Sequence, residues 1–436
     1  MKPATARPGT TRPCTIRQCA ILAGGLGTRL GALTAHTPKP ILPVGGRPFL
    51  AWLLRELVRF GVEEAVLLTG HLAPQVEDAV RDAAARLPRP LRLRFSAEPT
   101  PAGTGGALHW ARDLLDERFL LLNGDSLFDT NLARLLADAA ADGPEVTGRM
   151  LLRHLPDAGR YGVVDTSGDR IAAFRERSTS GGPGTINAGV SLFNRRVLDE
   201  VAPHCSNGPC SLERDVLPRL AARGALRGTV ADGYFIDIGV PDDFARAQTE
   251  LPRRLRRPAL FLDRDGVLNV DHGWVGTRER WEWTPAAREA VAAATGRGWH
   301  VFVVTNQSGI ARGHYDEAAL RSLHGWMEDE LHRAGGTVDD WRFCPFHPDA
   351  TVAAFRHDAH PWRKPAPGMI VDLLQRWDLD PARCVLVGDQ PTDLAAAQAA
   401  GIRGVRFEGT DLLATVERLP GFGDGAATCP EAATPP

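Results

Sequence analysis

Residues 21–40 read ILAGGLGTRLGALTAHTPKP, and this stretch decides the fold of the first half of the chain. The apolar residues around its start predict a short buried strand, Ala20–Ala23, and apolar stretches of helix and strand length then alternate. Such alternation predicts a parallel sheet with helices on both faces, which binds ligands at the carboxyl ends of its strands. The expected elements are helix Phe49–Phe60, strand Ala65–Thr69, helix Pro74–Leu87, strand Leu91–Phe95, helix Ala107–Leu115 and strand Phe119–Leu122, then an antiparallel extension of shorter strands over residues 146–234.

A second unit starts near residue 258, where residues 260–271 read LFLDRDGVLNVD. Strand Ala259–Leu262 ends in aspartates, and further strand and helix patterns predict a second doubly wound parallel sheet. We therefore expect domains at residues 18–251 and 259–412, a linker at 252–258, and disordered tails at 1–17 and 420–436. The four linker arginines are interpreted as solvated residues rather than as a nucleic-acid patch.

Composition narrows the class of protein. The 436 residues include 51 Lys and Arg against 53 Asp and Glu, so the net charge of -2 gives no indication of nucleic-acid binding. No apolar run reaches the ~18 residues of a membrane helix. The seven cysteines are scattered, which predicts reduced thiols in a cytoplasmic protein rather than a disulfide framework. The sequence leaves the oligomeric state open.

Residues 22–30 form a glycine-rich loop directly after the first strand. Glycines let the backbone approach a polyphosphate and point its N–H groups at the phosphates. Arg29 and Lys39 can add positive charge. The alternative is a simple glycine turn with two surface cations.

The whole run from Gly24 to Pro40 resembles the signature of sugar-1-phosphate nucleotidyltransferases, and this resemblance extends over the N-terminal domain. It implies that the loop binds a nucleoside triphosphate and that Arg29 and Lys39 act on its phosphates. The segment Glu98–Leu108 resembles the base-recognition segment of members that transfer guanylyl groups, which implies GTP. The implied nucleotide-binding residues are Leu22, Ala23, Gly24, Gly25, Gly27, Thr28, Glu98, Gly103 and Thr104.

Three further segments carry the same resemblance. Asp125, in Asn-Gly-Asp, and Asp237, in Tyr-Phe-Ile-Asp, match the aspartates that bind Mg²⁺ in that family. Asn187 and Gly189 match a strand that contacts the sugar. Glu176-Arg177 stands where the family usually has Glu-Lys, so the cation is kept but its shape changes.

In the second unit, Asp263 and Asp265 are two residues apart at the end of a strand. One carboxylate can attack phosphorus while the other protonates the leaving oxygen and later activates water. This pattern is weak alone, but Thr305-Asn306, Arg363-Lys364-Pro365 and Gly388-Asp389 follow it in order.

These pieces together resemble the haloacid dehalogenase superfamily of phosphatases. The resemblance implies that Asp263 is the nucleophile and Asp265 the acid/base, that Thr305 and Asn306 hold the phosphoryl group, and that Lys364 neutralises it. Asp389, with Asp263 and the carbonyl of Asp265, would bind Mg²⁺. Asp393 is expected to cap a helix or to support the site from behind.

Three longer segments are FLDRDGVLNVDHGWV (261–275), TNQSGIARG (305–313) and RKPAPGM (363–369). They resemble the branch with a minimal cap, which includes heptose 1,7-bisphosphate and histidinol-phosphate phosphatases. Arg363 then suits a second anionic group on the substrate. Because one half would leave heptose 1-phosphate and the other would consume it, the resemblance implies consecutive steps of GDP-heptose synthesis. Two alternatives stay open: a hexose-1-phosphate nucleotidyltransferase fused to a histidinol-type phosphatase, or an N-terminal half that only binds nucleotide sugars.

Zinc is the point where the chain departs from that branch, whose members often carry a Cys-x-His and Cys-x-Cys zinc loop. Here Phe346, His360 and Trp362 occupy three of the four ligand positions and only Cys344 remains. The sequence therefore predicts a loop without zinc. A substitute site is the alternative, because zinc accepts mixed nitrogen and sulfur ligands and Cys344, His347, His357 and His360 are close in sequence.

Overall fold

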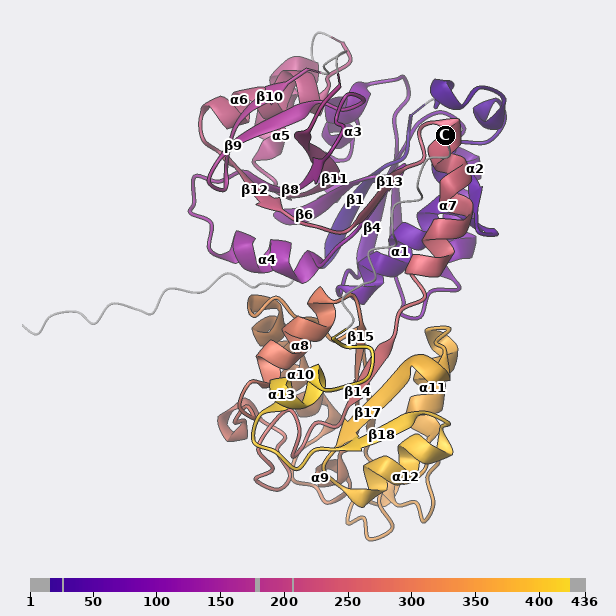
Figure 1. Cartoon of the computed structure of the whole chain (residues 1–436), viewed down its shortest axis with the longest axis vertical. Coiled ribbons are helices and arrows are strands. Elements are labelled where there is room, and N and C mark those ends of the chain that lie inside the picture. Colours follow the sequence, from indigo (N-terminus) through magenta and orange to yellow (C-terminus); the bar gives the residue numbers. More distant parts are fainter. Residues whose placement is uncertain (1–15, 26, 177–180, 206–207, 424–436) are drawn as a thin grey trace, which may run out of the picture.

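The structure is a computed structural model, and it describes residues 16–423 apart from 26, 177–180 and 206–207. Two α/β domains follow one another along the chain (Figure 1). Arg177 and most of the two predicted tails lie outside the described residues. Among the described helices, none combines the length and the apolar character that crossing a bilayer requires.

The N-terminal domain is built on a nine-stranded sheet in the order β5-β4-β1-β6-β11-β8-β12-β10-β9. Strands β5, β4, β1 and β6 are parallel, as predicted, and β11 extends them in antiparallel fashion. The predicted extension is wrong in two details: β12 is parallel to β8, and β11 is the longest strand, with 11 residues. The strands are β1 (Gln18–Leu22), β4 (Glu64–Thr69), β5 (Arg92–Ala97), β6 (Arg118–Asn123), β8 (Gly148–Leu155), β9 (Val163–Ser167), β10 (Arg170–Arg175), β11 (Gly184–Asn194) and β12 (Leu226–Val230), with two separate ribbons formed by β2 (Pro43–Val44) and β3 (Arg47–Pro48) and by β7 (Ser126–Asp129) and β13 (Tyr234–Asp237).

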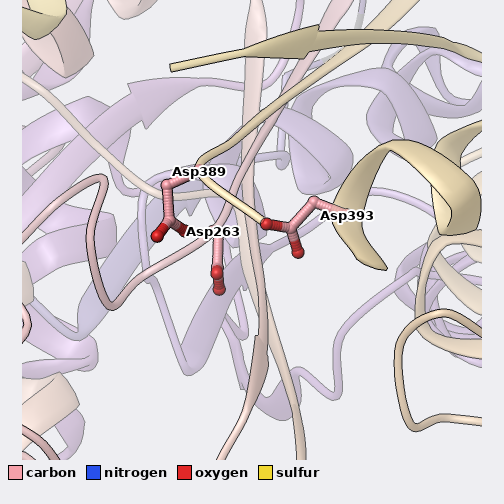
Figure 2. Close-up of side chains that lie close together, drawn as sticks. All are labelled: Asp263, Asp389 and Asp393. Atoms are coloured by element: carbon pink, nitrogen blue, oxygen red, sulfur yellow. The ribbon is translucent and has the colours of Figure 1, made fainter. Parts of the chain in front are cut away.

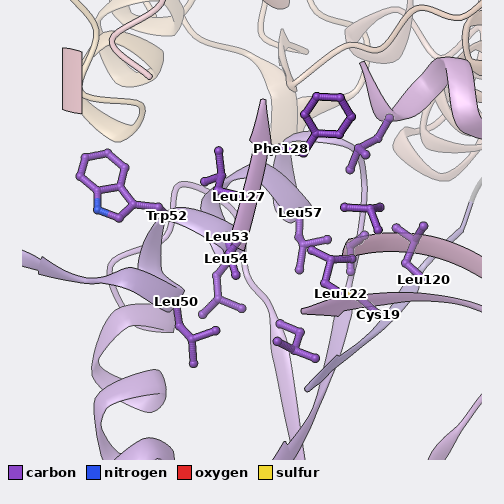
Figure 3. Packing of buried hydrophobic residues seen from close by; sticks show 14 of the residues in the cluster. Cys19, Leu50, Trp52, Leu53, Leu54, Leu57, Leu120, Leu122, Leu127 and Phe128 are labelled. Atoms are coloured by element: carbon purple, nitrogen blue, oxygen red, sulfur yellow. The ribbon is translucent and has the colours of Figure 1, made fainter. Parts of the chain in front are cut away.

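Helices cover both faces of this sheet. Helix α1 presents Leu53, Leu54 and Leu57 to the sheet at helical spacing, and they pack in one core with Leu120 and Leu122 of β6 (Figure 3). The helices of this face are α1 (Phe49–Arg59), α2 (Ala73–Ala84), α4 (Leu132–Ala140) and α7 (Pro241–Arg254). Those of the other face are α3 (Gly103–Trp110), α5 (Val197–Cys205) and α6 (Leu217–Ala222).

The C-terminal domain contains the predicted second parallel sheet, in the order β16-β15-β14-β17-β18. Its strands are β14 (Ala259–Leu262), β15 (His300–Asn306), β16 (Asp340–Cys344), β17 (Cys384–Gly388) and β18 (Arg403–Arg406). Its helices are α8 (Ala287–Gly296), α9 (Ser308–Ala311), α10 (Glu317–Arg333), α11 (Gly368–Arg376), α12 (Pro391–Ala399) and α13 (Leu412–Glu417). Packing continues beyond the predicted end of the domain at 412, because Phe422 is buried against Trp299.

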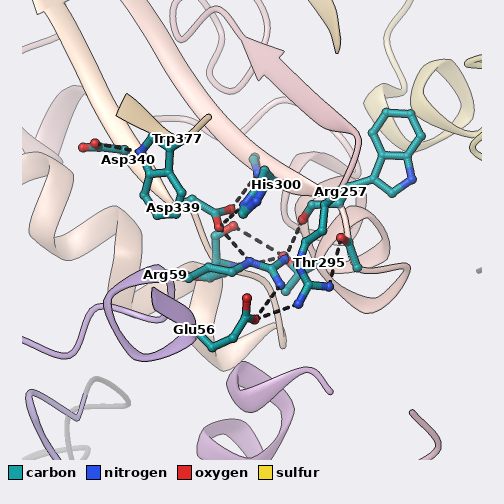
Figure 4. A network of polar contacts seen from close by, with 12 residues as sticks. Glu56, Arg59, Arg257, Thr295, His300, Asp339, Asp340 and Trp377 are labelled. Carbon is teal, nitrogen blue, oxygen red and sulfur yellow. Dashed lines mark hydrogen bonds and ion pairs between the residues drawn. The ribbon is translucent and has the colours of Figure 1, made fainter. Parts of the chain in front are cut away.

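The two domains meet at the ends where their parallel strands begin. Arg59, at the end of α1, donates to Asp339 Oδ1 at 2.7 Å and to the carbonyl of Trp299 at 2.6 Å, just before β16 and β15 start (Figure 4). Arg89, before β5, donates to the carbonyl of Asp339 at 3.1 Å. The carboxyl ends of both sheets, where the predicted sites lie, therefore face away from the shared interface.

The interpretation of the linker arginines as solvated is wrong for Arg257. Its side chain is 4% exposed and contacts Glu56 Oε2 at 2.8 Å and Asp129 Oδ1 at 2.7 Å. Two carboxylates from the other domain compensate its charge and offset the free-energy cost of removing it from water. No local sequence pattern identifies such distant partners.

Candidate active sites

The glycine-rich loop follows β1 at the carboxyl edge of the N-terminal sheet. Gly27 has φ of +63°, and a Cβ added there would lie 3.0 Å from Thr34 Cγ2, so this turn requires glycine. Thr34 Oγ1 donates to the carbonyl of Gly27 at 3.0 Å and fixes the loop against the turn that follows. Earlier in the loop, Leu22 ends β1 and Ala23 N donates to the carbonyl of Leu68 at 2.9 Å.

Four charged side chains gather beside this loop. Lys39, buried, forms an ion pair with Asp125. The ribbon of β7 and β13 places Asp237 opposite Ser126, next to Asp125, and Arg29 lies against Gly239. Burial, and then the charge of Asp125, raises the pKa of Asp237. Two adjacent carboxylates with two cations suit Mg²⁺ and phosphates, because Mg²⁺ in such sites takes one or two carboxylates plus phosphate oxygens.

The helix in the predicted base-recognition segment differs from expectation, because α3 begins at Gly103, four residues before the predicted start at Ala107. Gly103 has φ of +77°, and an added Cβ would overlap with the carbonyl of Cys210, whose oxygen also accepts from Gly105 N at 2.9 Å. Glu98 Oε2 accepts from Ala102 N at 3.1 Å, and burial raises the pKa of Glu98. Its other oxygen lies against Gly24 and Gly70, so this carboxylate borders the glycine loop.

A small open pocket lies beside the predicted sugar strand. Asn187 and Gly189 line it together with Leu22 and Glu213. Glu213 was not predicted as a site residue; it accepts from Thr104 Oγ1 at 2.8 Å. Glu176 is exposed and directly follows β10. The last residue of β10 and Ile186, the neighbour of Asn187, both pair with Val163, so Glu176 lies near the predicted sugar strand.

In the C-terminal domain, three neighbouring strands end at one edge and bring the predicted phosphatase residues together. Asp263 follows β14, Thr305 and Asn306 end β15, and Asp389 follows β17. Lys364 is buried and its Nζ contacts Asp263 Oδ1 at 2.8 Å, Asp393 Oδ1 at 2.6 Å and the carbonyl of Val304 at 2.9 Å. Asn306 Oδ1 accepts from Lys364 N at 3.0 Å, which holds the lysine backbone in place.

Carboxylate oxygens of Asp263, Asp389 and Asp393 lie within 4.8 Å of one another (Figure 2). Burial raises the pKa of Asp263 to about 7 despite the opposing charge of Lys364. Asp389 Oδ1 is buried without a hydrogen-bond partner among the described residues. Asp393 caps α12, as predicted, and pairs with Lys364. The free oxygens of Asp263 and Asp389 therefore fit Mg²⁺, which prefers oxygen ligands.

Asp265 is held by a separate set of partners. Buried Arg264 donates from Nη2 to both of its oxygens, at 2.8 and 2.9 Å, and Gln307 Nε2 donates to Oδ2 at 2.8 Å. Its carboxylate is thus held by Arg264 and Gln307, whereas Lys364 contacts Asp263 and Asp393. The main chain after Asp265 lies against Asp389, because a Cβ on Gly266 would be 2.5 Å from Asp389 Oδ2. This arrangement can present Asp265 to a leaving oxygen.

Comparison with known proteins places both halves. A family model described as Nucleotidyl transferase matches residues 19–254, more than half of the chain. The chain belongs to the nucleotidyl transferase family. A second model, described as HAD-hydrolase-like, matches residues 361–408 of the same protein.

Curated relatives of this nucleotidyltransferase cover its two halves separately. It is 49% identical over 164 residues to D-glycero-β-D-manno-heptose-1,7-bisphosphate 7-phosphatase of Rhodopseudomonas palustris, which covers 38% of this chain and 91% of that protein. It is 32% identical over 234 residues to D-glycero-α-D-manno-heptose 1-phosphate guanylyltransferase of Aneurinibacillus thermoaerophilus, covering 53% and 96%. It is 35% identical over 245 residues to mannose-1-phosphate guanylyltransferase of Mycobacterium tuberculosis, covering 55% and 66%. The chain is therefore both a nucleotidyltransferase and a phosphatase.

Two of the four residues considered for zinc lie together in the phosphatase half, where Cys344 Sγ is 3.8 Å from His360 Nδ1. Among the described residues, the one group of three or more carboxylate, thiol or imidazole side chains with metal-ligand spacing is that of the three aspartates. His347 Nδ1 accepts from Asp349 N at 2.9 Å, and His360 Nδ1 accepts from Trp362 N at 3.1 Å. The ring of Phe346 stacks on His360 with centroids 4.1 Å apart. The loop is packed by these rings.

Three residues near the phosphatase site are not among those predicted from the sequence. Gln307, directly after Thr305-Asn306, donates from Nε2 to both Asp265 Oδ2 and Thr305 Oγ1. Arg264 is fully buried between two predicted aspartates. Its place in Asp-Arg-Asp is the one signal in the sequence that could have identified it. Burial lowers the pKa of Arg363, and the charge of Arg312 lowers it further. The two arginines are therefore neighbours in space, although 51 positions separate them in the sequence.

Proposed function

We propose that the two halves catalyse consecutive steps of nucleotide-activated heptose synthesis. The C-terminal half would remove the 7-phosphate of D-glycero-D-manno-heptose 1,7-bisphosphate, and the N-terminal half would transfer GMP from GTP to heptose 1-phosphate. The observation that carries this proposal is that each half matches nearly the full length of a heptose enzyme, and removal of the 7-phosphate leaves a heptose 1-phosphate, the class of substrate for which the other enzyme is named.

In the phosphatase step, an oxygen of Asp263 attacks phosphorus and the bond from phosphorus to the C7 oxygen breaks. Asp265 gives its proton to that leaving oxygen, then takes a proton from the water that hydrolyses the aspartyl phosphate. Lys364 offsets the phosphoryl charge, and Thr305 and Asn306 line the same edge. Mg²⁺ held by Asp263 and Asp389 would supply further charge stabilisation.

In the transfer step, a phosphate oxygen of heptose 1-phosphate attacks the α-phosphorus of GTP and pyrophosphate leaves. The attacking phosphate is already anionic, so the chain mainly has to offset repulsion between anions. Arg29, Lys39 and the loop N–H groups serve this purpose. Asp125 and Asp237 would hold Mg²⁺, which when bound neutralises the phosphates.

Two arginines at the phosphatase site favour a bisphosphate over a compact monophosphate. Arg312 Nη2 lies 3.4 Å from His347 Nε2, and Arg363 Nη1 donates to the carbonyl of Phe346 at 3.2 Å. Neither guanidinium has a carboxylate partner within the described part of the chain. Two neighbouring guanidinium groups without counter-ions suit a second phosphate, here the 1-phosphate.

We expect Arg363→Gln and Arg312→Gln each to raise KM for heptose 1,7-bisphosphate about tenfold, because each removes charge-assisted hydrogen bonds worth ~1.4 kcal/mol. Steady-state phosphate release measures this effect. Arg376→Gln is the control, since Arg376 is exposed on α11 and pairs with Asp372. Equal losses with acetyl phosphate, which has no second phosphate, would argue against this role.

The nucleotide should be GTP. A carboxylate such as Glu98 can accept hydrogen bonds from guanine N1–H and N2–H₂, which adenine cannot offer in that pattern. We expect kcat/KM with GTP to exceed that with ATP or dTTP by at least about tenfold, and Glu98→Gln to reduce this ratio. Pyrophosphate release with each nucleotide, after heptose 1,7-bisphosphate is supplied as each anomer, tests this prediction and the proposed function together.

The anomers matter because the two relatives are named for opposite configurations at C1. Hydrolysis at C7 leaves C1 unchanged, so both halves must accept the same anomer for the steps to be consecutive. Phosphate release from one anomer and pyrophosphate release only with the other would contradict the proposal.

The second candidate for the N-terminal half is a transferase that prefers mannose 1-phosphate. Its 35% identity to a mannose-1-phosphate guanylyltransferase favours this alternative.

We expect the purified protein to contain less than one zinc per chain. The rings of Phe346 and His360 already pack the loop, and the imidazoles are engaged by backbone N–H groups. Metal analysis and chelation check this: phosphatase activity should return fully when Mg²⁺ alone is restored. One tightly held zinc, lost in His347→Ala or His360→Ala, would establish the substitute site instead.

The five described cysteines are unpaired, which supports a cytoplasmic location.

A further inference from the structure

An exposed aromatic pair stands beside the phosphatase site. The ring of Trp274 stacks on His314 with centroids 4.1 Å apart and planes 17° from parallel. Trp274 remains 46% exposed, although large side chains of this kind usually lie inside a domain. Because His314 covers one face of the indole, the exposed surface of the pair includes its other face.

The backbone around Trp274 is fixed in an unfavourable conformation. Trp274 has φ of +48°, a left-handed value that is uncommon for a bulky residue. Neighbouring contacts hold it there: Gly273 N donates to Asp271 Oδ1 at 2.8 Å, and Arg280 Nη2 donates to the carbonyls of His272 and Gly273 at 2.8 and 2.9 Å. Strain of this kind is maintained when the surrounding structure determines it, and it concentrates at functional sites.

Both members of the pair are chain neighbours of residues linked to Asp265. The carbonyl of Val275, next to Trp274, accepts from Arg264 at 2.5 Å, and Arg264 binds both oxygens of Asp265. Tyr315, next to His314, donates its hydroxyl to Gln307 Oε1 at 2.7 Å, and Gln307 binds Asp265. Tyr315 also packs directly against Gly276.

Two hydrogen-bonded connections therefore place the pair on the side of the acid/base carboxylate. Asp265 must face the leaving oxygen, and the group attached to that oxygen is the sugar. Because both connections end on Asp265, the indole is expected on the side toward which the leaving group extends.

We propose that Trp274, supported by His314, is a stacking platform for the sugar of the phosphatase substrate. The C–H groups on one face of a pyranose pack on an indole, as apolar surfaces do on aromatic rings, while its hydroxyls stay available for solvent. The platform makes Trp274 a specificity-determining residue that favours ring-containing sugar phosphates. This inference rests on the proposed function of the C-terminal half.

The test compares a sugar substrate with one that has no ring. We expect Trp274→Ala to raise KM for heptose 1,7-bisphosphate about three- to tenfold and to leave kcat/KM for acetyl phosphate unchanged. Trp274→Phe should restore most of the affinity, because it keeps an aromatic face. Trp110→Ala is the matched control, since Trp110 is 56% exposed in the other domain.

Each outcome is decisive. An unchanged KM for the sugar in Trp274→Ala overturns the platform, and so does an equal loss with both substrates when Trp274→Phe restores neither. If the wild-type protein hydrolyses acetyl phosphate but not heptose bisphosphate, the proposed function fails instead. The platform is then tested in the same way with the pyranose phosphate that the wild-type protein hydrolyses fastest.

Discussion

Asp263→Asn should lower phosphate release from heptose 1,7-bisphosphate by at least ~10³-fold, because an amide cannot form the aspartyl phosphate. The same variant should transfer GMP to supplied heptose 1-phosphate at the wild-type rate. Asp125→Ala should do the reverse, since it removes a carboxylate from the other site. Malachite-green detection of phosphate and an enzyme-coupled assay of pyrophosphate measure the two reactions separately.

The separation follows from how the domains meet. Asp263 comes after β14, and Asp125 comes after β6, while the interface lies where the parallel strands begin. A four-residue strand spans about 13 Å, so neither substitution touches the interface. Asp378→Ala is a matched control, because this exposed aspartate takes part in neither site. Loss of both activities in Asp263→Asn, with the fold intact, would show that the sites are coupled.

The sites were largely predictable from sequence because their residues follow strands directly. A buried apolar run such as Leu260–Leu262 predicts a strand, and parallel strands end at one edge, so Asp263, Thr305 and Asp389 were expected to meet. Asp265 shows the limit of this reasoning. Its partners, Arg264 and Gln307, depend on side-chain directions that spacing does not determine.

Contacts between segments distant in sequence could not be predicted in this way. Arg257 lies in a stretch with the composition of a solvated linker, and only the fold places Glu56 and Asp129 beside it. Likewise, α3 begins at Gly103 where the carbonyl of Cys210, more than a hundred positions away, accepts from Gly105 N. The interface between the domains consists almost entirely of such contacts.

That interface leads to the second prediction: Asp339→Ala should destabilise the protein by about 3–5 kcal/mol. Asp339 is fully buried and accepts from Arg59 Nε at 2.7 Å, His300 Nδ1 at 2.8 Å and Val301 N at 2.7 Å (Figure 4). Its loss leaves the buried guanidinium of Arg59 with Glu56, at 3.6 Å, as its remaining carboxylate partner among the described residues. Urea unfolding at pH 7.5, followed by tryptophan fluorescence, measures the change.

Burial lowers the pKa of His300 to about 4, so this histidine is neutral at pH 7.5 and the charged pair there is Arg59 with Asp339. A folded-state pKa below the ordinary value means that the unfolded chain binds the proton more readily. His300 therefore lets the protein keep its full stability above about pH 6.5 and lowers it as the pH falls toward 4. Unfolding should accordingly need less urea at pH 5 than at pH 7.5.

A surface ion pair across the same two domains provides the comparison. Arg47 and Asp378 lie 3.4 Å apart, with side chains 47% and 77% exposed, so Asp378→Ala should cost less than about 1 kcal/mol. Replacing both buried partners, as in Arg59→Leu with Asp339→Leu, should cost less than Asp339→Ala alone, because no unpaired charge then remains buried. If Asp339→Ala were as mild as Asp378→Ala, the domains would not be held together by the buried pair, and the outward orientation of the two sites would lose its physical basis.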